Sequence, residues 1–145
     1  MTISHVLVGT DGSKGAQLAV AFAADLAAQL GASVRLVHAF EPLVAMETAK
    51  PPVDFAALRD HAREQLQGRW AEALIGAGVA FDTKVVEGPP VEVLVKEAAN
   101  ADIGLVVIGS HGASGWADRI FGRVATGLAA SISRPVLTVP LDRPA

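Results

Sequence analysis

Glycines that follow an apolar segment mark the part of the sequence best suited to binding chemistry. Residues 106–108 are Val-Val-Ile, and Gly109, Gly112 and Gly115 come next, before a helical pattern resumes. A strand that runs through glycines into a helix leaves backbone N–H groups unpaired, and the positive end of the helix dipole points at the same turn. The pattern predicts an anion-binding corner, and phosphate is the ligand that we expect there. A plain tight turn remains the alternative, because glycines follow strands in many α/β folds.

The corner contains no recognisable catalytic group. It has neither the G-x-x-x-x-G-K-[ST] nor the G-x-G-x-x-G sequence, so a phosphate would be held by backbone donors. The chain has no cysteine and no serine in a G-x-S-x-G turn, which leaves the corner without a nucleophile. His111 lies inside the corner and has the chemistry of a donor or base, although a loop histidine is more often only solvated. These features indicate a binding site rather than a catalytic one.

A second candidate, Asp11, follows the first apolar segment in the sequence Gly9-Thr10-Asp11. A carboxylate at the end of a strand suits a ribose hydroxyl or a base amino group. The same position also suits a cap for the helix that follows, a role that Ser13 is equally able to fill. If the strands that end at Gly9 and Gly109 are neighbours, their two turns face each other.

Alternating patterns predict the elements that position these residues. The expected fold class is α/β, a single doubly wound, Rossmann-like, five-stranded parallel sheet with helices on both faces, in one domain over residues 1–145. Such sheets bind ligands at the carboxyl ends of the strands, where the strand order reverses. We expect the third strand at an edge, because its apolar residues alternate, and the continuously apolar fourth strand in the interior. The predicted strands cover residues 4–9, 33–40, 79–86, 102–109 and 135–139, and the predicted helices 14–30, 55–75, 91–99 and 117–133.

Composition excludes several classes of protein. The 145 residues suit one domain, and a net charge of −3 without a basic run argues against nucleic-acid binding. No apolar run approaches about 20 residues and no basic leader precedes the first strand, so we expect a cytoplasmic protein without a membrane partner. His5, His38 and His61 lie on separate predicted elements without metal-ligand spacing, and we expect no metal site.

The glycine spacing resembles that of the universal stress proteins, whose ATP-binding members carry G-x2-G-x9-G-[ST] after the fourth strand. Gly109, Gly112 and Gly122 match the three glycines, whereas Arg123 stands at the Ser/Thr position. Residues 6–13, 36–39 and 134–140 are also similar to stretches of the family, so the resemblance spans nearly the whole chain.

The resemblance implies a stress-response protein that senses an adenine nucleotide, with ATP, with or without Mg²⁺, as the ligand and no catalytic residue. It also implies a homodimer in which the edge strand of residues 135–139 pairs with its copy. The residues that it implies for the site are Asp11 at the adenosine; Gly9, Thr10 and Ala39 at the base; Ile108, Gly109 and Gly112 at the ribose and phosphates; and Gly122, Arg123 and Val124 at the distal phosphates.

Arg123 is the one departure from the motif. Its guanidinium offers a charged fork suited to phosphate oxygens, but its bulk is also able to fill the space of the last phosphate. Two alternatives therefore stay open beside ATP binding: an interaction module of the same fold that binds no nucleotide, and a slow ATPase.

Overall fold

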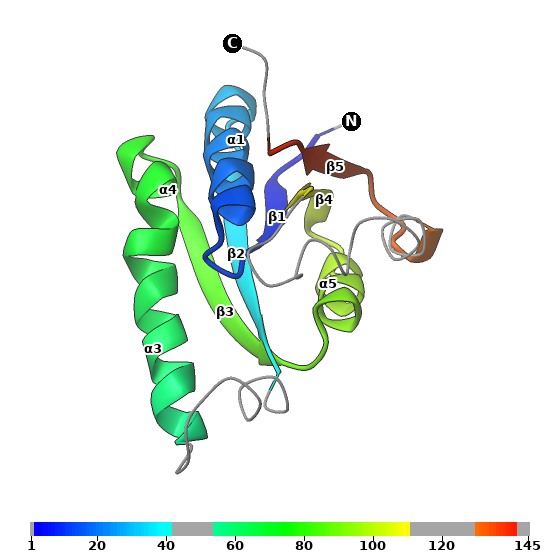
Figure 1. The fold of residues 1–145 in the computed structure, drawn as a ribbon. Coiled ribbons are helices and arrows are strands. Elements are labelled where there is room, and N and C mark those ends of the chain that lie inside the picture. The colour runs from blue at the N-terminus through cyan, green and yellow to red at the C-terminus, as the bar shows by residue number, and fades with distance from the viewer. Residues whose placement is uncertain (1, 42–53, 111–129, 142–145) are drawn as a thin grey trace.

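A five-stranded parallel sheet forms the centre of the computed structural model, which describes residues 2–41, 54–110 and 130–141 (Figure 1). The strand order is β3-β2-β1-β4-β5, and every pairing is parallel. The order reverses between β1 and β4, which confirms that the strands ending at Gly9 and Gly109 are neighbours. The strand bounds are β1 His5–Gly9, β2 Ser33–Phe40, β3 Phe81–Glu87, β4 Ile103–Gly109 and β5 Val136–Val139.

Helices cover both faces of the sheet, as the alternating sequence pattern predicts. One face carries α1, α3 and α4, and the other carries α5 (Figure 1). Successive strand residues point to opposite faces, so the continuous apolar runs of β1, β2 and β4 supply two buried clusters at once. The helix bounds are α1 Lys14–Leu30, α3 Phe55–Gln67, the 3₁₀ turn η1 Arg69–Ala71, α4 Glu72–Gly76 and α5 Pro90–Ala98. Within the described ranges, no helix has the length and apolar character needed to cross a membrane.

The first helix has the predicted bounds, residues 14–30, and Ser13 rather than Asp11 caps it. The Ser13 hydroxyl accepts a hydrogen bond from the Ala16 N–H, and Gly31 closes the helix with a φ of 65°. Its buried positions are occupied by glycine, valine and five alanines. Small side chains bring the helix backbone close to the sheet, which becomes important where α1 meets the end of β4.

The helix predicted over residues 55–75 is not continuous, and this prediction is wrong. Gly68 takes φ −127° and ψ −104°, outside the helical region, and the chain turns through η1 before α4 begins. The apolar spacing of the segment suits both arrangements, so only the glycine signals the break. The break carries Trp70 on a 3₁₀ turn rather than on a regular helix.

Other boundaries differ from the prediction by one or two residues, within the usual uncertainty of helix and strand ends. The third strand lies at an edge and the fourth in the interior, as expected. Residues 117–129 of the last predicted helix, and residues 42–53 of the proline-containing segment before α3, lie outside the described ranges.

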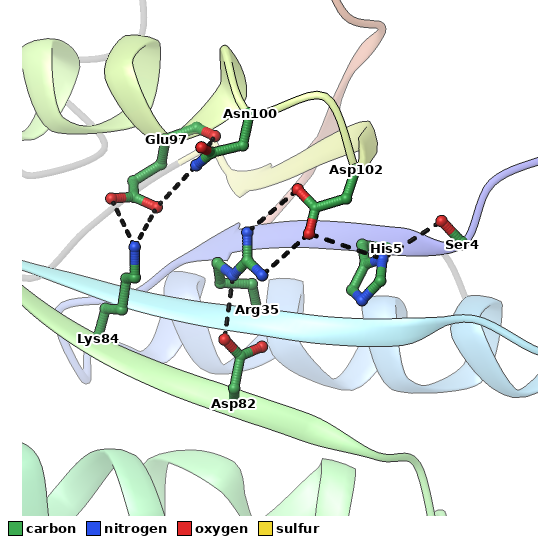
Figure 2. A network of polar contacts seen from close by, with 8 residues as sticks. All are labelled: Ser4, His5, Arg35, Asp82, Lys84, Glu97, Asn100 and Asp102. Atoms are coloured by element: carbon green, nitrogen blue, oxygen red, sulfur yellow. Dashed lines mark hydrogen bonds and ion pairs between the residues drawn. The ribbon is translucent and has the colours of Figure 1, made fainter.

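Polar and charged side chains at the amino ends of the strands form what we call the amino-end network: His5, Arg35, Asp82 and Asp102 (Figure 2). The Arg35 guanidinium lies 3.1 Å from Asp82 Oδ2 and 3.1 Å from Asp102 Oδ2. The hydrogen bond to Arg35 lowers the pKa of Asp102, and the same bond is the largest cause that raises the pKa of Arg35. Both charged forms are thereby stabilised.

Candidate functional site

The turn after β1 is held by its own side chains. The Gly12 N–H donates to Thr10 Oγ1 at 3.1 Å, and the Ser13 N–H donates to Asp11 Oδ1 at 2.9 Å. The Thr10 N–H donates to the Val37 carbonyl at 2.9 Å, which joins the turn to β2. Short polar side chains that bond to nearby backbone are typical of such turns. The turn therefore has a defined shape without help from a ligand.

Asp11 has one carboxylate oxygen with a partner and one without. Oδ2 is buried and makes no hydrogen bond within the described part of the chain, whereas Oδ1 accepts from the Ser13 N–H. Ser13 caps α1, so Asp11 is not the helix cap that the sequence left open. A buried acceptor without a donor costs about 1–3 kcal/mol, and more when it is charged. Oδ2 is thus an acceptor available to a donor from a ligand.

His38 lies beside this turn, and no sequence pattern indicates that it belongs to the site. Its Nδ1 lies 2.9 Å from the Thr10 carbonyl. Since a carbonyl can only accept, Nδ1 donates and must carry the hydrogen. Burial lowers the pKa of His38, while the bond to Thr10 and the charge of Asp11 act in the opposite direction. The imidazole is therefore held in its neutral form more strongly than a free histidine.

Trp70 packs against both His38 and the turn. The two ring centroids are 5.2 Å apart at an interplanar angle of 56°. A Cβ added at Gly12 would lie 2.5 Å from indole atoms, and Gly12 has a φ of +79°, so both space and backbone conformation require glycine there. No sequence pattern predicts this contact, because Trp70 and Gly12 lie on elements far apart in the chain. We call Thr10, Asp11, Gly12, His38 and Trp70 the carboxyl-end cluster.

The end of β4 is fixed by packing against the start of α1. A Cβ at Gly109 would lie 2.5 Å from the Gly15 carbonyl oxygen and 2.8 Å from its carbon. The next residue, Ser110, donates its N–H to the Val139 carbonyl at 2.9 Å and accepts the Leu141 N–H at 3.2 Å. The glycine that opens the corner is therefore required by helix packing, whatever it contributes to a phosphate.

The structure brings part of the predicted site together. Gly9, Thr10, Asp11 and Gly109 lie at the carboxyl ends of the neighbouring strands β1 and β4. Ala39 and Ile108 belong to the buried cluster on the α5 face, where they are 5% and 0% exposed. The remaining predicted residues, Gly112, Gly122, Arg123 and Val124, lie outside the described residues.

These groups suit the nucleoside part of a nucleotide. A ribose hydroxyl or an adenine amino group is a donor that Asp11 Oδ2 can accept from. The backbone N–H groups proposed for the phosphates belong mainly to the part of the corner beyond Ser110, which the structure does not describe. Over the described ranges no three His, Asp or Glu side chains gather as metal ligands do.

Comparisons with known proteins agree on one family. The sequence pattern of the universal stress protein family matches residues 2–140. A universal stress protein of Mycobacterium tuberculosis is 35% identical over 135 residues, which cover 91% of this chain and 44% of that protein. The chain thus spans less than half the length of the curated relatives that it matches.

Solved structures share the fold. A universal stress protein in complex with cAMP is 26% identical, with a TM-score of 0.71, and the match covers 98% of this chain and 100% of that one. A universal stress protein from Archaeoglobus fulgidus in complex with dAMP is 22% identical, with a TM-score of 0.66 and coverage of 95% and 98%. At that identity the second likeness concerns the fold alone.

Proposed function

This chain belongs to the universal stress protein family, and from that premise we propose that it binds an adenine nucleotide, with ATP as the physiological ligand, at the carboxyl ends of β1 and β4. In this proposal the protein acts in a stress response by sensing the nucleotide. Binding changes the surface that the glycine corner presents to other molecules.

The observation that carries the proposal is the buried, unpaired Oδ2 of Asp11. A buried acceptor without a partner is unfavourable in the free protein, and a donor from a ligand removes that cost. The atom lies where doubly wound sheets bind their ligands, beside the strand-order reversal between β1 and β4. Asp11 would accept a hydrogen bond from the adenosine, with Gly9 and Thr10 beside the base.

Two further observations favour an adenine nucleotide. The universal stress protein that is 26% identical was solved in complex with cAMP. The glycine motif that follows β4 in ATP-binding members of the family is present as Gly109, Gly112 and Gly122. The choice of ATP over AMP or cAMP rests on this motif, because its last glycine and the next two residues, Arg123 and Val124, would hold the distal phosphates.

Calorimetric titration of ligand-stripped protein tests the proposal. ATP, ADP, AMP, cAMP and adenosine are titrated with and without Mg²⁺, and GTP serves as the control for the base. We expect binding of the adenine series, tightest for ATP with Mg²⁺, and at least tenfold weaker binding of GTP. Absence of heat for every adenine compound contradicts the proposal.

Arg123 favours a second candidate, an interaction module that binds no nucleotide. The residue replaces the Ser/Thr of the family motif with a longer, charged side chain. If its bulk excludes the last phosphate, Arg123→Ser should create ATP binding where the unmodified chain shows none. Equal ATP affinity of the two proteins would rule out this role of Arg123.

We further propose a homodimer built on the outer edge of β5. Val136–Val139 ends the strand order and pairs with β4 on one side only within the described sheet. A second copy would cover this edge, which otherwise presents unpaired backbone groups. Light scattering should give twice the chain mass, and dilution should raise amide exchange in β5. A monomeric mass at all concentrations contradicts the dimer.

A further inference from the structure

We propose that Trp70 and His38 are positioning residues for the nucleotide site, which hold the turn of residues 10–13 so that Asp11 Oδ2 faces the ligand. The inference rests on the proposed function, since it concerns the same site. Neither residue needs to touch the nucleotide. Both act through the turn, from the face of the sheet that α1, α3 and α4 cover.

Ser13 joins one end of the turn to the start of α1, and few other groups outside the turn fix its position. Two of its hydrogen bonds, Gly12 N to Thr10 Oγ1 and Ser13 N to Asp11 Oδ1, join the turn only to itself. Two hydrogen bonds join the turn to β2. The Thr10 N–H donates to the Val37 carbonyl, and His38 Nδ1 donates to the Thr10 carbonyl. His38 therefore fixes one end of the turn by a direct hydrogen bond.

Trp70 limits the other side of the turn. Its indole lies where a Cβ of residue 12 would stand, at 2.5 Å, so Gly12 and the ring are in close packing contact. The same ring packs on His38 at a centroid separation of 5.2 Å. One aromatic side chain thus restrains both the imidazole that holds Thr10 and the residue that follows Asp11.

The break at Gly68 brings this ring to the turn. Trp70 lies on η1, and η1 exists because Gly68 leaves the helical region between α3 and α4. Packing in this way connects η1 to the turn that carries the Asp11 carboxylate, although the two lie far apart in the sequence.

The test compares variants of the pair with a matched control. Trp70→Leu removes the aromatic ring that packs on Gly12 and His38, and Trp70→Phe keeps a ring there. His38→Leu removes the donor to the Thr10 carbonyl, and His38→Asn keeps a donor. Phe81→Leu is the control, because Phe81 packs against the same buried cluster from the edge strand β3. Thermal unfolding of each variant measures the general loss of packing.

Affinity for adenosine, AMP and ATP separates positioning from stability. We expect Trp70→Leu and His38→Leu each to weaken the binding of all three ligands about tenfold or more. This factor corresponds to the loss of one hydrogen bond to a charged group. The factor should be equal for the three ligands, because the turn serves the adenosine and not the phosphates. Trp70→Phe and His38→Asn should keep most of the affinity. Phe81→Leu should keep the full affinity even if it loses as much stability as Trp70→Leu or His38→Leu.

A double variant shows whether the pair acts through Asp11. Once Asp11→Asn has removed the carboxylate, adding Trp70→Leu should cost no further affinity. Additive losses would overturn the inference, as would unchanged affinity of Trp70→Leu and His38→Leu in a protein that binds adenosine.

Amide hydrogen exchange gives a readout without ligand. The Gly12 and Ser13 amides should exchange at least tenfold faster in Trp70→Leu than in Phe81→Leu. Equal exchange in the two variants overturns the inference even if nucleotide binds. If the unmodified chain binds no adenine compound but the two amides do exchange faster, the proposed function fails while the control of the turn by Trp70 stands.

Discussion

The two ends of the sheet carry polar clusters that differ in how completely their atoms are paired. In the amino-end network, Arg35 lies between Asp82 and Asp102, and both carboxylates have a charged partner. In the carboxyl-end cluster, Asp11 has one oxygen bonded to backbone and one buried oxygen without a partner. The first cluster joins neighbouring strands, whereas the second leaves one buried acceptor without a partner.

The comparison shows that charge alone does not identify a site in this fold. The amino-end network contains more charged groups, and the pKa values of Arg35 and Asp102 are shifted there, yet both shifts come mainly from a partner inside the protein. The two ends of the sheet differ in whether every buried polar atom has a hydrogen-bond partner.

The largest effect is expected at the end of β4. In Gly109→Ala the new methyl group would lie 2.5 Å from the Gly15 carbonyl oxygen, so α1 or β4 must shift. We expect the free energy of unfolding to fall by about 3 kcal/mol, the upper part of the range for overpacked cores. Gly76→Ala is the control, because nothing lies within 4 Å of its added Cβ. Denaturant unfolding of both variants measures the difference, and equal stability would contradict the packing role of Gly109.

Asp11→Asn and Asp102→Asn compare the two ends through the same chemical change. Asp11→Asn keeps an acceptor for the Ser13 N–H but replaces the unpaired oxygen, so nucleotide affinity should fall about ten- to a hundredfold. Its stability should stay equal or rise, since the buried group without a partner no longer carries a charge. Asp102→Asn should leave affinity unchanged. Calorimetry measures both, and an equal loss in the two variants would end the functional distinction between the clusters.

The two ends should also respond to acid in different pH ranges. Burial lowers the pKa of His38 below its ordinary value of 6.5. Between the lowered value and 6.5 the unfolded chain binds a proton that the folded chain does not, so stability falls as pH falls through this window. Asp102, whose pKa Arg35 holds below its ordinary 3.8, contributes stability above 3.8 that is lost only as pH falls through the lowered value.

Unfolding curves from pH 8 to pH 3 measure this difference. His38→Leu should flatten the loss of stability that begins near pH 6.5, and Asp102→Asn should leave that part of the profile unchanged. A His38→Leu profile that parallels the unmodified chain between pH 8 and pH 5 would contradict the effect of burial on His38.

The smallest effect is expected on the stability of the amino-end network. Asp102 is 41% exposed, and surface ion pairs contribute about 0–1 kcal/mol. Asp102→Asn should therefore lower the free energy of unfolding by less than about 1 kcal/mol, and added salt should reduce the difference. Denaturant titration at low and high salt checks this. A loss of unfolding free energy as large as that of Gly109→Ala would show that the network contributes more to stability than its exposure indicates.

Much of the fold follows from the sequence because its signals are local. The apolar runs and the alternation of β3 predict the strands, the bounds of α1 and the edge of the sheet, and the structure confirms them. The prediction of one helix over residues 55–75 is wrong because the apolar spacing fits a helix on both sides of Gly68. The backbone conformation of this one glycine causes the break.

Less of the site follows from the sequence because its contacts are long-range. Asp11 and Gly109 were found from their places at strand ends, but the open oxygen of Asp11 depends on which atoms surround it. The packing of Trp70 on Gly12 and His38 joins three separate elements, and no spacing in the chain encodes it. The remaining motif residues, from Gly112 to Val124, lie outside the described ranges and stay predictions.

The strand order has a consequence for how the chain acquires its structure during synthesis. The central strand β1 pairs on one side with β2, which follows it closely, and on the other with β4, whose residues begin at Ile103. At about 5–20 residues per second, ribosomes need about 5–20 s to extend the chain from β1 to β4. During that interval one edge of β1 has no strand to pair with, and closing the long loop slows folding further. The nascent chain therefore exposes an unpaired edge of the apolar strand β1 for seconds, and during this interval a chaperone that covers the edge would protect the chain most.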